Sequence, residues 1–347
     1  MMQESNKKRY SWQMAALIIC FVAAILISVV VGRYSVSLGD FFKIIWSKLP
    51  IVDASGMIPT WTKAAETILL EVRLPRVACA ILIGAALSVA GVCYQGMFRN
   101  PMVSPDILGA TTGAGFGASV AILLGAGYFL ISTTAFICGI GAVLLAYMVS
   151  RFSKTNETLA LILGGMVISS LFTAGTSYVK LVADTDEELP AITYWLMGSL
   201  SSIKPEDLLF VTIPIIAGLI PLFLLKWRLN LLTIEEDTSK SVGINVTALR
   251  FVVIICATLI TAASVSVSGM IGWVGLVIPH FCRLIYGYDY RKLIPTTALF
   301  GATFLLVVDD IARLATTQEL PIGILTSFVG APLFIYLLVT GGGLKRD

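Results

Sequence analysis

The sequence contains few of the residues that soluble enzymes use. Charged residues make up 13% of its 347 residues, whereas soluble domains average about 25%. The chain has one histidine, His280, which cannot form a metal-ligand set by itself. The patterns GxxxxGK[ST], HExxH and GxSxG, which mark nucleotide loops, zinc proteases and serine hydrolases, do not occur. We therefore predict a protein that is not an enzyme, with no catalytic residue, metal site or cofactor.

Cysteine usage argues against a disulfide framework. The six cysteines all lie in or beside apolar runs, and no two of them form a CxxC pair. Apolar residues make up 57% of the chain, and its mean hydropathy is +0.91. The sequence is therefore that of an all-α, polytopic membrane protein whose thiols pack as small hydrophobic side chains.

Ten apolar runs are candidates for membrane-spanning helices, which need about 20 residues each. They cover residues 12–32, 75–96, 107–124, 128–149, 158–180, 207–226, 249–268, 271–287, 293–313 and 322–340. The first run is longer than the core of a typical signal peptide, and no A-x-A cleavage site follows it, so we predict a retained helix. Ten spans place both termini on the same side of the membrane.

The basic residues predict which side that is. With the N-terminus inside, most of the 24 Lys and Arg residues fall on the inner side, and the bias is clear in the short loops. Because short cytoplasmic loops carry an excess of Lys and Arg, we expect both termini in the cytoplasm. The polar segment Leu231–Asn245, which interrupts the apolar second half, is then cytoplasmic as well.

Two stretches predict irregular or closely packed helices. Gly109, Gly113 and Gly117 recur at a spacing of four, which lets neighbouring backbones approach closely. Pro101 and Pro105 precede this run, and a second Gly-rich stretch covers Ser268–Gly275. We expect broken or re-entrant elements at both places, buried in protein or lining a cavity.

Ionisable residues within the predicted spans are few. Asp309 and Asp310 lie near an outer helix end, and Lys180 lies at another. An ion-coupled secondary transporter usually needs a carboxylate near the middle of the membrane. A secondary transporter is therefore the less favoured alternative, and we expect another subunit to supply the driving force.

Several motifs appear in one order along the chain. The first half contains Val72–Arg76, Gly84–Gly91, Gln95–Pro101, Asp106–Gly109 and Tyr194–Leu200, and the second half contains Gly272–Leu284, Asp289–Arg291, Ala312–Leu314, Glu319–Gly323 and Gly330–Phe334. This order, from about residue 70 to residue 340, resembles the FecCD-type permease subunits of ABC importers for iron-siderophores, haem and cobalamin.

The resemblance implies an ABC type II importer permease with ten transmembrane helices, formed by a single domain over residues 1–347. It implies a bacterial cytoplasmic membrane and a dimer, homomeric or heteromeric, without nucleic acid. It also implies two cytoplasmic ABC ATPase subunits, which hydrolyse the ATP, and an extracytoplasmic substrate-binding protein. An iron-siderophore is the favoured cargo, and haem, cobalamin and molybdate are the alternatives.

The resemblance also implies roles for three groups of residues. Arg73, Arg76 and Arg313 match arginines that meet carboxylates of the binding protein, and Asp310 stands where an apolar residue is expected. Asn156, Glu157 and Thr158 align with a cytoplasmic gate. The ATPase-coupling segment covers about residues 231–247 and contains Glu235, Glu236, Asp237, Ser239, Lys240, Ser241 and Gly243.

Overall fold

The long apolar runs form helices in the structure, a computed structural model that describes residues 2–32, 34, 36–48, 61–154, 156–234 and 245–339. Seven helical stretches in this part of the chain are long and apolar enough to cross a membrane. They are α1 (Met2–Val30), the continuous stretch Lys63–Met97 that ends in α4 (Leu74–Met97), α6 (Tyr128–Phe152), α7 (Glu157–Val182), α9 (Pro205–Leu224), α12 (Val246–Ser268) and α14 (Tyr290–Leu314).

Three further apolar helices are shorter. They are α5 (Ala110–Leu123), α13 (Val274–Tyr286) and α15 (Ile322–Val339). Each of the ten predicted runs therefore contains a helix, and the described residues include no strand, which confirms the all-α class. That all ten helices span the membrane stays a prediction, because three of them are short.

The structure also contains helices that we did not predict. They are α2 (Leu38–Lys48), α3 (Lys63–Thr67), the π-helix η2 (Ile68–Arg73), the 3-10 helix η3 (Pro105–Leu108), α8 (Glu188–Met197) and α10 (Lys226–Leu232). The first three lie in or border residues 33–72, between the first two predicted spans, where we predicted no helix. A local signal marks α2, because the Ser37 hydroxyl accepts a hydrogen bond of 3.0 Å from the Asp40 amide.

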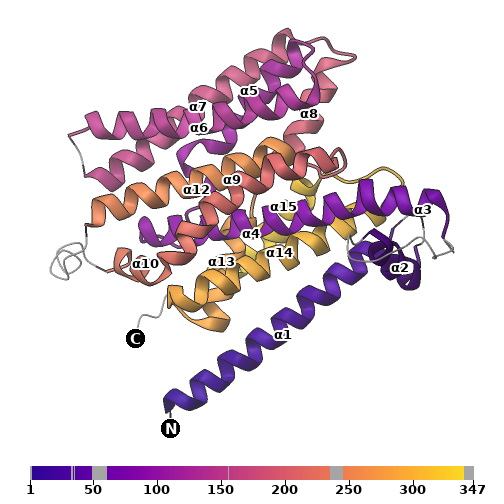
Figure 1. Ribbon diagram of the computed structural model, residues 1–347. Coiled ribbons are helices and arrows are strands. Elements are labelled where there is room, and N and C mark those ends of the chain that lie inside the picture. Colours follow the sequence, from indigo (N-terminus) through magenta and orange to yellow (C-terminus); the bar gives the residue numbers. More distant parts are fainter. Residues whose placement is uncertain are drawn as a thin grey trace.

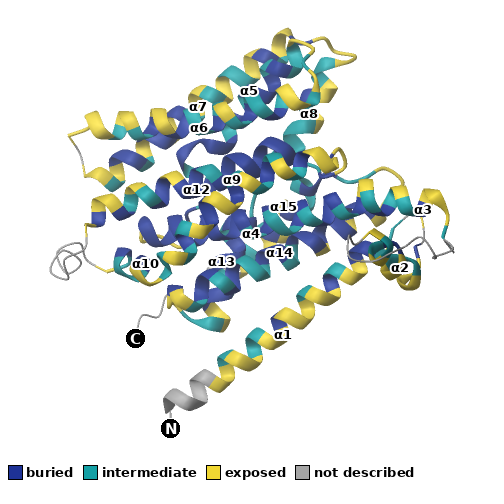
Figure 2. Ribbon diagram, viewed as in Figure 1, coloured by how far each residue is buried: buried dark blue, intermediate teal, exposed yellow. Residues whose placement is uncertain are grey.

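Helix α4 lies at the centre of the bundle (Figure 1) and is almost entirely buried (Figure 2). It packs against α9, α12, α13 and α14. A Cβ atom at Gly91 would lie 1.8 Å from the carbonyl oxygen of Gly275 on α13, so a side chain at Gly91 would prevent this approach of the two backbones. Small residues of this kind let membrane helices pack at short distances.

The glycine spacing correctly predicted a second close contact, between α5 and α6. A Cβ atom at Gly113 would lie 2.6 Å from the Cys138 carbonyl oxygen, and one at Gly117 would lie 2.5 Å from that of Thr134. Both carbonyl groups belong to α6. Since residues four apart share one helical face, the glycines form the surface on which α6 packs.

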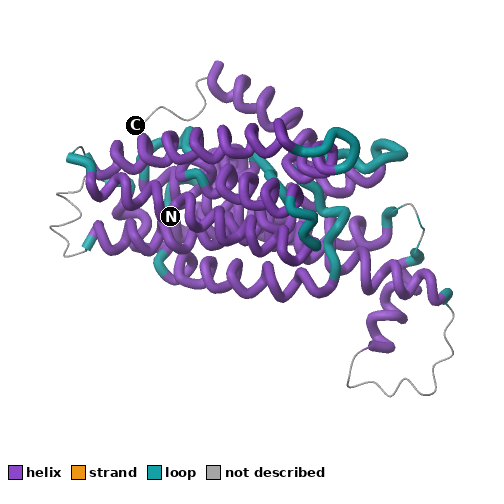
Figure 3. The backbone as a smooth tube through the Cα atoms, turned by 90° about the horizontal axis from the view of Figure 1, so that it is seen from above, coloured by secondary structure: helices purple, strands orange, loops and turns teal. Residues whose placement is uncertain are grey.

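Apolar side chains cover the outside of the bundle. Figure 2 shows α1, α6 and α7 with exposed faces, and large hydrophobic residues such as Phe129, Leu171 and Leu209 are more than 60% exposed. Figure 3 shows the long helices side by side along one direction, with most loops near the two ends. Such a surface suits contact with lipid or with other apolar subunits.

Both predicted interruptions are present. Before α5, the backbone passes through η3 and Gly109, whose φ is +88°. Between α12 and α13, Trp273 adopts a φ of 67°. The Ser199 amide donates a hydrogen bond of 2.8 Å to the carbonyl of Ser268, the last residue of α12. The carbonyl at the end of this helix is therefore paired with another segment.

Candidate functional site

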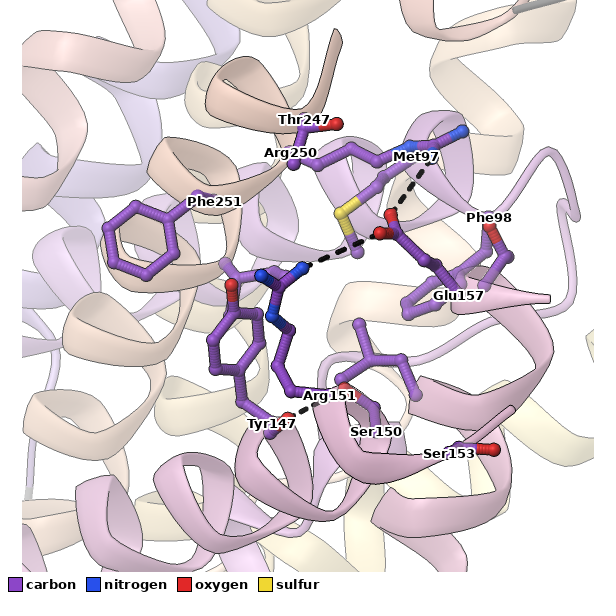
Figure 4. A pocket seen from close by; sticks show the side chains of 13 residues that line it. Met97, Phe98, Tyr147, Ser150, Arg151, Ser153, Glu157, Thr247, Arg250 and Phe251 are labelled. Carbon is purple, nitrogen blue, oxygen red and sulfur yellow. Dashed lines mark hydrogen bonds and ion pairs between the residues drawn. The ribbon is translucent and has the colours of Figure 1, made fainter. Parts of the chain in front are cut away.

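A pocket of about 120 Å³ lies where α6 ends and α7 and α12 begin (Figure 4). Its wall contains Arg151 from α6, Glu157 and Thr158 from α7, and Arg250 and Phe251 from α12. Two arginines and one carboxylate therefore meet at the ends of three helices. The mouth of this pocket carries a net positive charge.

Glu157 connects these three helices. One carboxylate oxygen lies 3.5 Å from Arg151 Nη1, and the other lies 4.0 Å from Arg250 Nη1. The Glu157 side chain is 60% exposed, so each ion pair contributes little stability by itself. The two contacts show that the predicted gate residue lies beside the first turns of α12.

The other two predicted gate residues form the start of α7. The Asn156 side-chain oxygen accepts a hydrogen bond of 3.0 Å from the Thr158 amide, which is an N-cap interaction. Asn156, Glu157 and Thr158 therefore lie together at one helix end, although their role in gating stays a prediction.

The predicted coupling residues Glu235–Gly243 lie outside the described residues, but the structure describes both flanks. On the N-terminal side, the Nε atom of Arg99 donates a hydrogen bond of 3.0 Å to the carbonyl of Leu232, at the end of α10. On the C-terminal side, the Asn245 side chain accepts a hydrogen bond of 2.9 Å from the Ala248 amide and so caps α12. The segment therefore follows α10, whose end is held by Arg99, and precedes α12, whose start is capped by Asn245.

Helix α10 is also tied to the start of α14 by one amide side chain. The Asn230 side chain donates a hydrogen bond of 3.0 Å to the Asp289 carboxylate and accepts one of 2.9 Å from the Tyr290 amide. Sequence reasoning missed Arg99 and Asn230, because neither has a local partner and each pairs with a residue far along the chain. Their polar side chains beside apolar runs were the available signal.

At the opposite end of α4, a buried group of charges surrounds Asp309. Its carboxylate is fully buried and accepts hydrogen bonds of 2.8–3.0 Å from the Nε and Nη2 atoms of Arg76. The Nη1 atom of Arg76 donates a hydrogen bond of 2.8 Å to the carboxylate of Glu319, whose side chain is 27% exposed. Arg76 therefore holds a carboxylate on each side, as the fork of the guanidinium allows.

The other two predicted docking arginines are also buried. Arg313 forms an ion pair with Asp310, and its Nε atom lies 3.4 Å from a carboxylate oxygen of Asp309. It also donates a hydrogen bond of 3.0 Å to the carbonyl of Ser28 in α1. Arg73 donates to the carbonyl groups of Val29 and Val30 at 2.6 and 2.9 Å. Since cations favour the C-terminal ends of helices, Arg73 is well placed at the end of α1.

The structure thus brings the three docking candidates together at one end of α1, α4 and α14. The positive charges of Arg76 and Arg313 face three carboxylates within the subunit, Asp309, Asp310 and Glu319. Arg73 instead contacts backbone carbonyl groups at the end of α1. Glu319 is the most exposed of these partners, so a second molecule can reach the group most easily at its side chain.

Comparison with known proteins matches residues 19–340 to the model of the FecCD transport family. The chain belongs to the FecCD transport family. It is 39% identical over 329 residues to the molybdate import system permease protein MolB of Haemophilus influenzae, covering 94% of this chain and 96% of that one. It is 42% identical over 279 residues to a protein of Helicobacter pylori named as an iron chelatin transport system permease, covering 80% and 84% of the two chains.

A solved structure agrees with this FecCD assignment. An ABC transporter described as of the metal-chelate type, in an inward-facing conformation, superposes with a TM-score of 0.84 and 38% identity, covering 95% of this chain and 99% of that chain. This FecCD chain is therefore the permease subunit of an ABC importer and a membrane protein, as the sequence motifs predicted.

Proposed function

We propose that this permease moves an iron-siderophore complex that an extracytoplasmic binding protein delivers. The Helicobacter pylori relative, named for an iron chelatin, supports this cargo, as does the metal-chelate type of the solved neighbour. Molybdate is the second candidate, because the similarity to MolB extends over 94% of the chain.

The assembly that we propose contains two permease subunits and two cytoplasmic ATPases in a bacterial cytoplasmic membrane, with both permease termini in the cytoplasm. In this orientation, the polar segment between α10 and α12 faces the ATPases. The ATPase hydrolyses ATP, and the permease converts that motion into a change of access to the transport pathway.

The observation that carries the coupling proposal is the attachment of the segment's two flanks. Arg99, two residues after α4, contacts the end of α10. The Asn230 side chain ties α10 to the start of α14, and Arg250 in α12 lies beside Glu157. A displacement of residues 235–244 would therefore reach the central helices through α10 and the start of α7 through α12. Both routes consist of direct polar contacts.

The coupling role is tested by Glu236→Ala combined with Lys240→Ala. We expect the reconstituted complex to keep its ATPase activity while binding-protein-dependent uptake falls at least tenfold. The control is Lys8→Ala, which removes a charge from the same predicted side of the membrane outside the segment. Unchanged uptake per ATP hydrolysed would contradict the docking role of the segment.

The docking role of the arginines follows a different logic, because they are buried and paired. A carboxylate of the binding protein would compete with Glu319 for Arg76. We therefore expect Glu319→Gln to strengthen capture of the loaded binding protein severalfold at low salt, with a smaller gain at high salt. Weaker capture by this variant would show that Glu319, rather than Arg76, faces the partner.

The cargo is tested by uptake into proteoliposomes that contain the permease, the ATPase and the binding protein encoded beside it. ⁵⁵Fe-loaded siderophore and ⁹⁹Mo-molybdate are offered separately, with and without ATP. We expect ATP-dependent accumulation of the iron complex. Accumulation of molybdate alone would replace the first candidate by the second, and uptake driven by an ion gradient without ATP would overturn both.

A further inference from the structure

A second hollow, between α6 and α12, adjoins the pocket at the start of α7. This hollow has a volume of about 80 Å³ and shares Tyr147, Phe251 and Ile254 with the first pocket. Together, the two hollows form a composite groove, polar at the helix ends and apolar farther along the helices.

The apolar part of the groove follows several turns of both helices. Its walls include Ile140 and Leu144 from α6 and Ile255 and Leu259 from α12. From Ile140 to Arg151, α6 rises by about 16 Å. The one hydroxyl in this wall that does not belong to Tyr147 is that of Thr258, which lies 3.1 Å from the Tyr94 hydroxyl and so has a partner within the protein.

The groove is open on the outside of the subunit. Leu144, Phe251 and Ile255 line it and are each 40–45% exposed. Both α6 and α12 are long and apolar enough to span the membrane, and the side chains at this opening are apolar, so the opening suits contact with the hydrocarbon region. A ligand that fills it must therefore have an apolar part several carbon atoms long.

The mouth of the groove has the opposite chemistry. Arg151 and Arg250 line it together with the single carboxylate of Glu157, so the charge is positive. Arg151 is 59% exposed, and its contact with Glu157 is long, at 3.5 Å, so its guanidinium can turn toward an anion at the rim. Arginine binds phosphate through its fork of N–H donors.

We propose that the composite groove binds an anionic glycerophospholipid. The phosphate contacts Arg151, the positive field of Arg250 attracts it, and one acyl chain lies between α6 and α12. The chemistry of a lipid, an anion followed by an alkyl chain, matches the order of the groove from its mouth inward. This inference requires that α6 and α12 cross the membrane and that the groove faces lipid rather than another subunit, and it is independent of the cargo.

The test uses the purified complex of the permease with its ATPase, stripped of lipid in detergent. Dioleoyl phosphatidylglycerol or dioleoyl phosphatidylcholine is added, and bound lipid is counted by native mass spectrometry. A basic residue near an anionic headgroup contributes about 1 kcal/mol, or about a fivefold change in affinity. We therefore expect a loss of about fivefold for Arg151→Gln and about 25-fold for Arg151→Gln with Arg250→Gln.

Arg291→Gln is the matched control. Its side chain is 59% exposed, like that of Arg151, and lies at the start of α14, outside the groove. We expect it to retain the anionic lipid fully. Equal loss in this control and in Arg151→Gln would show a general charge effect and would overturn the proposal.

The acyl-chain part is tested by Leu144→Trp, which fills the apolar groove from an exposed position. We expect this variant to lose phosphatidylglycerol even though both arginines remain. The proposal is overturned if phosphatidylcholine is retained equally well, or if glycerol phosphate competes as strongly as the intact lipid. Cross-linking between two copies through Ile255→Cys in native membranes would also overturn it, because the groove would then be a subunit interface.

Discussion

Replacing Asp309 by asparagine tests whether the buried charges at the end of α4 hold the bundle together. The Asp309 carboxylate is fully buried, accepts three close contacts from Arg76 and lies 3.4 Å from Arg313. Removing one partner of a buried ion pair costs about 3–5 kcal/mol, because the remaining charge is left without compensation. Each arginine here keeps one other carboxylate, Glu319 or Asp310, so we expect about 3 kcal/mol.

Thermal unfolding in detergent measures this effect. A fluorogenic thiol reagent reports unfolding as a signal above that of the exposed Cys20, because Cys79, Cys93, Cys256 and Cys282 are buried in the folded chain. A loss of about 3 kcal/mol corresponds to a decrease in Tm of roughly 4 °C for a chain of 347 residues. The binding-protein docking role of Arg76 plays no part in this measurement, so the two roles are separated.

The matched control is Glu319→Gln, which removes the other carboxylate that contacts Arg76. Because Glu319 is 27% exposed, its ion pair is worth about 1 kcal/mol or less. Combining Arg76→Gln with Asp309→Asn should cost less than the sum of the two single changes, since neither residue then leaves the other as an unpaired buried charge. A stable Asp309→Asn variant, or an equal loss in the control, would refute the reasoning.

The remaining predictions concern other parts of the chain. Gly113→Ala places a Cβ atom 2.6 Å from the Cys138 carbonyl oxygen and should cost about 1–3 kcal/mol, whereas Gly141→Ala, with no atom within 4 Å, should be neutral in the same thermal assay. Asn156→Ala removes the cap of α7 and should lower the free energy of unfolding by about 1 kcal/mol. An unchanged stability would show that packing alone holds the start of this helix. In a background lacking the native cysteines, Ser241→Cys should react with an impermeant thiol reagent only from the cytoplasmic side; reaction from outside would invert the topology.

The positions of the long helices along the chain were largely predictable, because the membrane imposes a strong one-dimensional pattern. An apolar run of about 20 residues has few alternatives to a helix, since its backbone groups must be paired within the segment. Helices α1, α4, α12 and α14 follow that rule. The shorter α2 and α8 were missed, because helices of 10 or 11 residues have weaker apolar signals than spans of about 20.

The candidate sites were predictable only in part. Family motifs selected Arg76 and Arg313. The i,i+4 spacing of Asp309 and Arg313 is a local signal for their contact, but nothing in the linear pattern indicated that Arg76 pairs with Asp309. The Arg76–Asp309 contact joins residues 233 positions apart. Likewise, Asn230 meets Asp289 across 59 positions. Such partnerships depend on which faces of two helices meet, and hydropathy contains no information about that choice.

The sequence by itself determined that this protein is an all-α membrane permease of the FecCD family, because hydropathy and ordered motifs are local properties of the chain. The tertiary structure decided which charged groups become partners. It buried Arg73, Arg76 and Arg313 against groups of the same subunit, and it placed Glu157 beside α12. The physical reason is that an ion pair between helices forms only where packing brings two side chains within a few ångströms, and packing is a property of the whole bundle.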